Sequence, residues 1–333
     1  MKEDIRSKIV ADFVAKLEKG VAPWVRPWTG SSIPVNHLTG KEYRGANILV
    51  LWMAALDRGY GSNRWLTFRQ ATEVAVREAR ARGVKVEKKT NPRTHSTYYV
   101  DAKTGELIPS VRKGEKGTSI VFWKFEDKIV RDEKGEESRR RFAYARGYTV
   151  FNIEQCEISK PKSDITVQAS THERNPSAEI TITNTKADIR FGGGMAYFQP
   201  KGDFIGMPEF EDFKNAESFY GTMFHELGHW SGHDTRLNRT FGKRFGDKDY
   251  AKEELVAELS SAFLCASHGI GSSLQHPEYL GHWVKALGEN PSVLFSVASQ
   301  AQKAADFVMG KKVEGSATED EENENNEVQA EAA

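Results

Sequence analysis

The sequence has few cysteines and no long apolar run. Its 333 residues include only Cys156 and Cys265, which lie far apart in the chain. We expect buried thiols here, neither a disulfide nor zinc ligands, which suits a reducing cytoplasm. No apolar stretch approaches the ~18 residues of a membrane-spanning helix, so we expect no membrane partner. Residues 1–6 lead into an amphipathic pattern, which is not typical of a secretion signal.

The chain also lacks net charge, because 47 Lys and Arg balance 47 Asp and Glu. Its two halves nevertheless differ. Residues 1–150 contain 30 Lys and Arg against 18 Asp and Glu, a balance of +12, so the remainder carries −12. A basic half on a neutral chain indicates a polyanionic partner, most simply nucleic acid. The alternative is that these basic side chains only decorate surface helices.

The clearest motif is the segment from His225 to His229, an H-E-x-x-H sequence within an amphipathic pattern. Histidines four residues apart share one face of a helix, so both can bind one Zn²⁺ ion at about 2.0–2.1 Å. Glu226 can then act as the catalytic general base toward water. The alternative is a helix with two surface histidines. The aromatic residues expected on the opposite face favour a packed helix that presents a metal site from a small, polar face.

A second helix, expected to begin with Asp249 as its N-cap, supplies the other candidate carboxylates. In zincins whose third ligand is a glutamate, one carboxylate binds the metal and another, one turn later, accepts the second ring N–H of a ligating histidine. We assign Glu254 to the metal and Glu258 to this hydrogen bond; the reverse assignment is the alternative. We interpret Glu253 as a solvated surface charge. His233 is a rival ligand, but Gly232 is expected to end the first helix before it.

The basic half alternates aromatic rings with cations. Bases of single-stranded DNA stack on such rings at about 1–3 kcal/mol each, and Lys and Arg bind the phosphates. The predicted DNA-binding residues are Trp24, Arg26, Trp28, Tyr43, Arg44, Arg64, Trp65, Arg112, Lys113 and Lys116. The alternative for each ring is a place in the core, and for residues 111–118 a basic turn between strands. We expect a polar hairpin with a turn at 101–105, and a charged hairpin tip at 127–141.

Together these segments resemble the ArdC-type antirestriction proteins of conjugative plasmids. The segments that carry the resemblance are 34–45, 65–68, 112–118, 148–152, 187–190, 225–233 and 253–258. The resemblance implies an N-terminal domain that binds single-stranded DNA without sequence preference, and a zincin-like metalloprotease domain. It also implies protection of incoming plasmid DNA from the recipient's restriction enzymes.

The sequence therefore predicts an α+β fold with two domains that have independent cores. We place a mixed α/β single-stranded-DNA-binding domain at 1–157, a linker at 158–177, the zincin-like metalloprotease domain with the H-E-x-x-H helix at 178–312, and a disordered acidic tail at 313–333. The expected cofactor is Zn²⁺ or another divalent metal. The expected partners are single-stranded DNA and a protein substrate, such as a restriction enzyme subunit or a DNA-bound protein. The alternative function is a non-catalytic DNA-coating protein with a structural metal site.

Overall fold

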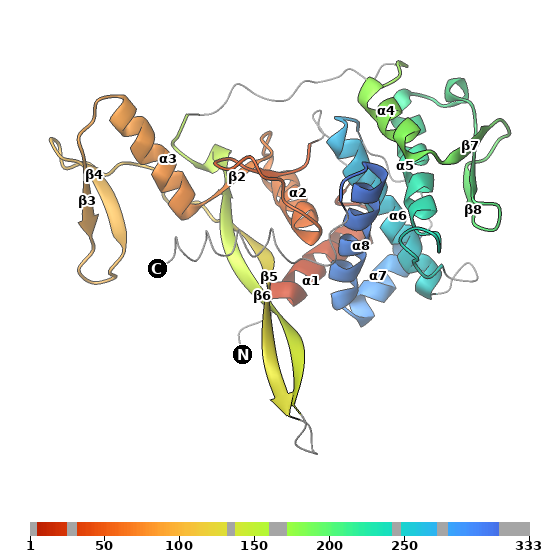
Figure 1. Ribbon diagram of the computed structural model, residues 1–333. Helices are drawn as coiled ribbons and strands as arrows, with labels where there is room; N and C mark the ends of the chain where they lie inside the picture. The colour runs from red at the N-terminus through yellow and green to blue at the C-terminus, as the bar shows by residue number, and fades with distance from the viewer. Residues whose placement is uncertain are drawn as a thin grey trace.

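The computed structural model describes residues 5–24, 32–131, 137–159, 172–241, 248–271 and 279–312 (Figure 1). Helices and sheets are mixed along the chain, which confirms the predicted α+β fold. The elements of the front half are α1 (Ile5–Glu18), β1 (Val35–Asn36), α2 (Ala46–Arg58), β2 (Arg64–Thr67), α3 (Phe68–Ala81), β3 (Val86–Thr90), β4 (Thr97–Asp101), β5 (Thr118–Arg131), β6 (Glu137–Asn152) and the 3-10 turn η1 (Ile153–Gln155).

The front half is built on a four-stranded sheet with the order β1-β2-β6-β5. β1 runs parallel to β2, and the other neighbours are antiparallel. Helix α2 packs against β5, and the Asn47 side chain exchanges two hydrogen bonds, of 2.8 and 2.9 Å, with the backbone of Val121 in that strand. Helix α3 begins at a capping box in which Thr67 and Gln70 each bond the other's backbone N–H, because these orphan donors need acceptors.

Two hairpins differ from the sequence-based expectations. β5 and β6 pair without a break from Thr118↔Val150 to Arg131↔Glu137, so the expected charged tip at 127–141 is mostly regular strand. Ring and β-branched residues continue along both strands and favour the longer ladder. The polar hairpin is present as β3 and β4, but its loop lies at 91–96. The expected turn at 101–105 follows β4 instead, where Gly105 N–H donates to Asp101 C=O at 2.8 Å.

The back half combines a small sheet with a stack of helices. Its elements are α4 (Pro176–Thr185), β7 (Asp188–Phe191), β8 (Tyr197–Gln199), β9 (Phe204–Met207), the 3-10 turn η2 (Phe210–Asp212), α5 (Ala216–Ser231), α6 (Lys248–Ser267), α7 (Leu280–Glu289) and α8 (Ser292–Val308). The sheet has the order β7-β9-β8, with β7 parallel and β8 antiparallel to β9. Helices α5, α6 and α8 pack against one another (Figure 1).

The two halves share one large hydrophobic cluster, and a smaller cluster around α3 and η1 lies in the front half alone, so their cores are not fully independent as expected. A single cluster of buried side chains runs from α1 to α8. Trp24 stacks on Phe13 at 5.8 Å between ring centroids and meets Trp283 of α7 edge-on at 5.7 Å. Trp52 of α2 meets Phe263 of α6 at 5.9 Å. Front-half aromatic residues therefore complete the packing of the back-half helices.

Within the described residues, none of the helices is both long enough and apolar enough to cross a membrane. The two cysteines are buried and free, as the sequence predicts.

Candidate metal centre

Helix α5 carries the H-E-x-x-H motif and is buried on nearly all sides. Its N-terminus is capped by Asn215, whose side chain accepts from Ser218 N–H at 2.8 Å, and it ends before Gly232. The expected aromatic face packs into the core, but the motif face is enclosed as well. His225 is 1% exposed and Glu226 is 6% exposed. The predicted small, polar face is therefore partly covered by α6.

Small residues allow α6 to approach α5 closely. A Cβ atom placed on Gly228 would lie 2.4 Å from Ser260 Oγ and 3.1 Å from Ala257 Cα. Nearby, Ser261 Oγ donates to Gly221 C=O at 2.7 Å, which ties the two helices together. This close contact brings the first turns of α6, and therefore Glu254, against the two motif histidines.

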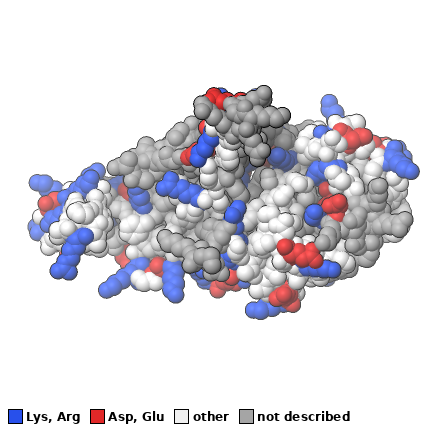
Figure 2. All heavy atoms as spheres, turned by 90° about the horizontal axis from the view of Figure 1, so that it is seen from below, with Lys and Arg blue, Asp and Glu red and all other residues white. Residues whose placement is uncertain are grey.

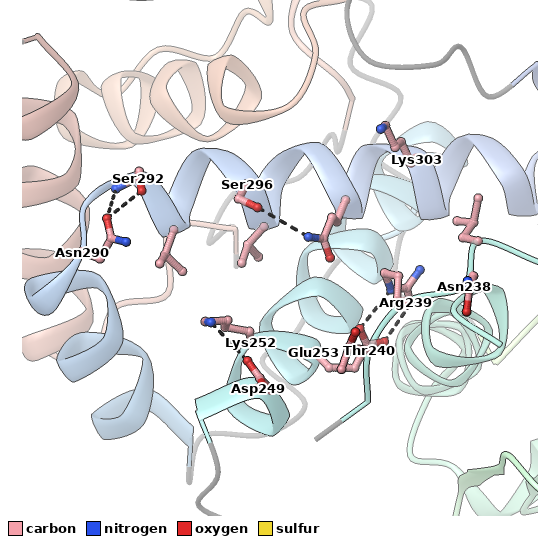
Figure 3. A pocket seen from close by; sticks show the side chains of 14 residues that line it. Asn238, Arg239, Thr240, Asp249, Lys252, Glu253, Asn290, Ser292, Ser296 and Lys303 are labelled. Atoms are coloured by element: carbon pink, nitrogen blue, oxygen red, sulfur yellow. Dashed lines mark hydrogen bonds and ion pairs between the residues drawn. The ribbon is translucent and has the colours of Figure 1, made fainter. Parts of the chain in front are cut away.

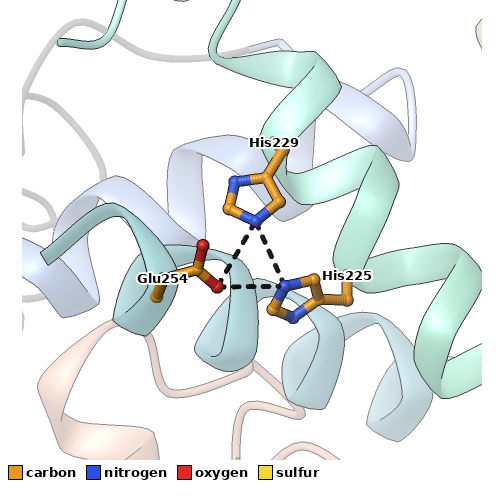
Figure 4. A group of neighbouring side chains, drawn as sticks. All are labelled: His225, His229 and Glu254. Atoms are coloured by element: carbon orange, nitrogen blue, oxygen red, sulfur yellow. Dashed lines mark hydrogen bonds and ion pairs between the residues drawn. The ribbon is translucent and has the colours of Figure 1, made fainter. Parts of the chain in front are cut away.

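His225, His229 and Glu254 form a compact triangle of ligand atoms (Figure 4). The two Nε2 atoms are 3.1 Å apart, and Glu254 Oε2 lies 3.5 Å from His225 Nε2 and 3.6 Å from His229 Nε2. Tetrahedral ligands with bonds of 2.0–2.1 Å stand about 3.3 Å from each other. The three atoms are therefore spaced as the corners of a tetrahedral metal site, and these residues fit a divalent metal.

Electrostatics favour a cation at the same place. Although burial opposes the shift, hydrogen bonds from both histidines hold the pKa of the Glu254 carboxyl well below its usual range. Burial also opposes charge on His229, but Glu253 and Glu254 outweigh it and raise the pKa of His229 to about 10. The carboxylates thus stabilise positive charge at the triangle, whether a proton or a metal ion supplies it.

Glu253, which the sequence did not predict for this role, accepts the hydrogen bond from the second ring nitrogen of His229. The Nδ1 and Oε1 atoms are 3.3 Å apart. Glu253 is 5% exposed, so its interpretation as a solvated surface charge is wrong. Glu253 and Glu254 are consecutive residues of α6, and Glu253 lies beside His229, the second histidine of the motif. Glu258 is also buried, and its predicted hydrogen bond to a histidine stays a prediction.

Arg239 holds the Glu253 carboxylate in place. Its Nε and Nη2 atoms donate to the two carboxylate oxygens of Glu253 at 2.9 and 2.7 Å. The same guanidinium donates to Gly228 C=O at 2.6 Å and to Ser231 Oγ at 2.9 Å. Arg239 therefore locks Glu253 to the end of α5. Sequence reasoning missed Arg239 because it lies in the irregular segment after α5, where no periodic pattern marks it.

Tyr250 is a further polar group at the centre. Its hydroxyl hydrogen-bonds Glu254, the residue one helical turn later on the same face of α6. Burial and the nearby carboxylates of Glu254 and Glu226 raise the pKa of Tyr250, whereas a hydrogen bond with Tyr279 lowers it. The Tyr250 hydroxyl is therefore protonated and able to donate at neutral pH, as an unshifted tyrosine would also be. The four-residue spacing to Glu254 was the signal that could have found it.

His233 lies outside the triangle, as expected. Its Nδ1 atom hydrogen-bonds Thr235 Oγ1 at 2.8 Å, and its ring meets Phe198 of β8.

A cavity of about 700 Å³ lies beside the Arg239–Glu253 ion pair (Figure 3). The segment 237–240, the first turns of α6 and helix α8 line it, and the Arg239–Glu253 pair forms part of its wall. None of the three triangle residues lines it. The ion pair therefore separates this cavity from His229.

The predicted DNA-binding rings are mostly in the core. Trp24 is 0% exposed, Trp65 is 1% exposed and Tyr43 is buried. Their ring faces are not accessible to bases, so the prediction that they are stacking platforms is wrong. Trp24 is covered by Phe13 and Trp283, both distant in sequence. Arg26 and Trp28 lie outside the described residues.

The predicted cations are more accessible than the rings. Arg112, Lys113 and Lys116 are exposed in the turn before β5, although Arg112 pairs with Glu115 at 2.7 Å. Arg64 is half-buried. Arg44 is exposed and forms an ion pair with the buried Asp306 of α8, so it also joins the two halves. Figure 2 shows Lys and Arg projecting from the end that carries α3, β3 and β4, with few acidic side chains among them.

This fold and site define a protein with a zincin-like domain joined to a second, basic α/β region. Two family models match the chain: "Zincin-like metallopeptidase" over residues 176–300 and "N-terminal domain of anti-restriction factor ArdC" over residues 3–151. The crystal structure of the antirestriction protein ArdC from plasmid R388, in its metal-free form, is similar with a TM-score of 0.69 and 34% identity, covering 92% of this chain and 97% of that one. The Mn(II)-bound structure of the same protein matches with a TM-score of 0.66, 31% identity and coverage of 92% and 98%.

Curated relatives agree with this result. The uncharacterized protein y4eC of Sinorhizobium fredii (strain NBRC 101917 / NGR234) is 36% identical over 316 residues, which cover 92% of this chain and 91% of the relative. A DNA primase TraC of Escherichia coli is 34% identical over 93% of this chain, but the match spans only 27% of the primase. The chain belongs to the ArdC antirestriction family.

Proposed function

We propose that this protein binds single-stranded DNA without sequence preference and carries a metal-dependent peptidase site, and that together these protect incoming DNA of a mobile element from host restriction. The triangle of His225, His229 and Glu254 beside Glu226 supports the enzymatic part most directly. We retain the proposed boundaries of 1–157 for the DNA-binding domain, 158–177 for the linker, 178–312 for the peptidase domain and 313–333 for the tail.

We propose Zn²⁺ as the metal, because two imidazoles and one carboxylate are a typical catalytic zinc set. Mn²⁺ is the second choice, since the similar R388 protein has a Mn(II)-bound structure and carboxylate ligands suit that ion. When bound, either metal would supply a Lewis acid that polarises a scissile carbonyl and acidifies water.

The chain's own residues supply the rest of the proposed reaction. Glu226 would accept a proton from the attacking water and return it to the leaving amine. Tyr250, held protonated, would donate a hydrogen bond to the oxygen on which negative charge develops. Glu253 and Arg239 would hold the His229 ring in place. The proposed protein substrate is a restriction enzyme subunit or another DNA-bound protein.

The test separates hydrolysis from metal binding with two variants. Glu226→Gln should keep the metal content and thermal stability of the wild type but lose cleavage of candidate substrates, whereas His225→Ala should lose metal. Both are compared for metal by mass spectrometry and for protection of transferred DNA against a restriction enzyme. Equal metal content in His225→Ala and the wild type would contradict the ligand assignment.

One observation favours a second function, a DNA-coating protein with a structural metal site. The triangle is nearly buried and includes residues of both α5 and α6, so a bound metal would also stabilise the packing of these two helices. If Glu226→Gln protects DNA as well as the wild type, this second function is correct and proteolysis is not required.

In the DNA-binding part, we propose that Arg112, Lys113, Lys116 and Arg64 contact the phosphates. Arg44 is partly neutralised by Asp306. Each phosphate contact to a single strand should contribute about −0.7 to the slope of log affinity against log salt concentration. A slope near zero, or equal affinity for duplex DNA, would contradict this part of the proposal.

A further inference from the structure

The hairpin of β5 and β6, which we call the ribbon, projects from the body of the protein (Figure 1). Its base is fixed from both sides. β6 pairs with β2 from Trp65↔Asn152 to Thr67↔Val150, and Asn47 of α2 bonds both backbone groups of Val121 in β5. The outer part continues as a two-stranded ladder to Arg131↔Glu137. The ribbon is therefore an anchored arm, whose outer part includes the residues 127–141 that were predicted to form a charged tip.

One face of β6 presents aromatic rings alternating with a cation. Phe142, Tyr144, Arg146 and Tyr148 occupy every second position, so they share a face of the strand. Tyr148 is half-buried near the base and packs edge-on against Phe122 at 5.2 Å. Farther out, Phe142 is 37% exposed and Tyr144 is 41% exposed. The outer rings thus keep accessible surface that a core role would have removed.

Cations accompany these rings. Lys128 Nζ lies 5.0 Å from the Tyr144 ring centroid and 6.0 Å from that of Phe142, and it donates to the Tyr144 hydroxyl at 2.8 Å. The Arg146 guanidinium lies 5.6 Å from the Tyr148 ring. Across both strands, seven Lys and Arg stand against three Asp and Glu. Positive charge beside exposed rings favours an anionic partner with flat, stackable groups.

The spacing of the rings favours an unpaired strand over a duplex. Residues two apart on a strand are separated by about 6.8 Å, twice the rise of about 3.4 Å between stacked bases along one strand of B-DNA. Neighbouring rings on β6 can each take a base only if the bases have separated from each other. Duplex DNA keeps its bases stacked and covers their faces.

We propose that the ribbon face formed by Phe142, Tyr144 and Arg146 stacks the bases of single-stranded DNA, with Lys128 and Arg146 neutralising its phosphates. The exposed cations of 112–116 directly precede β5 and extend this basic path at the base of the ribbon. This inference rests on the proposed binding of single-stranded DNA, and it assigns that binding to a surface other than the buried tryptophans.

The first test compares ring loss with ring retention in the full-length protein. Affinity for a fluorescent oligothymidylate of about 16 nucleotides is measured by anisotropy at fixed salt. Tyr144→Leu should weaken binding by roughly 5- to 150-fold, the loss of one stacked base. Tyr144→Phe should bind as the wild type does. The matched control is Phe191→Leu, which removes a ring that is similarly exposed on β7 of the back half.

The second test addresses charge. Lys128→Gln should make the salt slope shallower by about 0.7, the value of one phosphate contact to a single strand. Ultraviolet crosslinking of an oligonucleotide that contains 5-iodouracil should yield an adduct on Phe142 or Tyr144. Both ring side chains are partly exposed, so these substitutions should leave the melting temperature unchanged.

The outcomes distinguish binding of single-stranded DNA by the protein from the assignment of that binding to the ribbon. If the wild type does not bind the oligonucleotide, both the DNA-binding function and this inference fail. If the wild type binds but Tyr144→Leu and Lys128→Gln bind equally well, the function stands and the ribbon assignment is wrong. A change in the protein's mass in solution on Tyr144→Leu substitution, without a change in DNA binding, would assign the face to a second copy of the chain instead.

Discussion

Replacing Glu253 with glutamine tests the geometry of the metal centre most sharply. The carboxylate accepts three hydrogen bonds from charged or polarised donors: one from His229 at 3.3 Å and two from Arg239 at 2.7 and 2.9 Å. A glutamine keeps the shape but offers one acceptor oxygen and one amide that can only donate. Arg239 donates to both oxygens and therefore meets the amide group in either orientation, whereas His229 keeps an acceptor only when the glutamine oxygen takes the Oε1 position.

The magnitudes follow from burial. Removing a carboxylate of this kind behind a ligating histidine should weaken metal binding by roughly 10- to 100-fold. The side chains of Arg239 and Glu253 are only 7% and 5% exposed, so breaking their ion pair should also cost about 3–5 kcal/mol of folding stability. The double variant Arg239→Met with Glu253→Gln removes both charges and should recover much of this stability. It should not recover metal affinity.

Two measurements check these expectations. Metal affinity is obtained for Zn²⁺ and Mn²⁺ by competition with a chromophoric chelator, and stability from thermal unfolding of the metal-free proteins. Glu258→Gln is the matched control, because it removes a buried carboxylate from the same helix, one turn from Glu254. Wild-type affinity in Glu253→Gln combined with a loss in Glu258→Gln would refute the reasoning and return the histidine-orienting role to Glu258.

Four further predictions concern the packing and the site. Gly228→Ala should destabilise the protein by about 1–3 kcal/mol and lower its metal content, since the added methyl group would overlap Ser260; thermal unfolding checks this. Gly281→Ala in α7 has open space around it and should be neutral or stabilising by up to about 1 kcal/mol in the same assay. Tyr250→Phe should lower kcat by about 100-fold or more with unchanged metal content, measured on any substrate that the wild type cleaves. A fragment ending at residue 159 should aggregate, as light scattering would show; a soluble, folded fragment would contradict the shared core.

Periodic patterns predicted the local structure of the centre well. Four-residue spacing placed His225 and His229 on one helix face. The zincin pattern also led to Glu254, which the structure places beside both histidines. These features depend on residues close in sequence, so a single segment contains the information that determines them.

The features that sequence reasoning missed depend on contacts between distant segments. Glu253 and Glu254 are adjacent, and only the packing of α6 against α5 decides which one faces the second nitrogen of His229. Likewise, Trp24 is flanked by charged and proline residues that resemble a binding segment. Its burial is decided by Trp283, far along the chain. Alternation of rings and cations therefore could not distinguish the core ring Trp24 from the exposed Tyr144.

The shared cluster gives the two halves a physical connection in addition to the covalent one. Trp24 of the front half packs against Trp283 of α7, and the Trp283 indole donates to Ala251 C=O at 2.9 Å, in the turn of α6 that carries Tyr250 and Glu254. The buried Asp306 holds Arg44 from the other side. Well-packed cores do not tolerate voids, so moving the front half relative to α7 would disturb the turn that carries Glu254. The proposed DNA surface and the proposed metal site are thus parts of one packed body, in which the position of Glu254 depends on aromatic side chains from both halves.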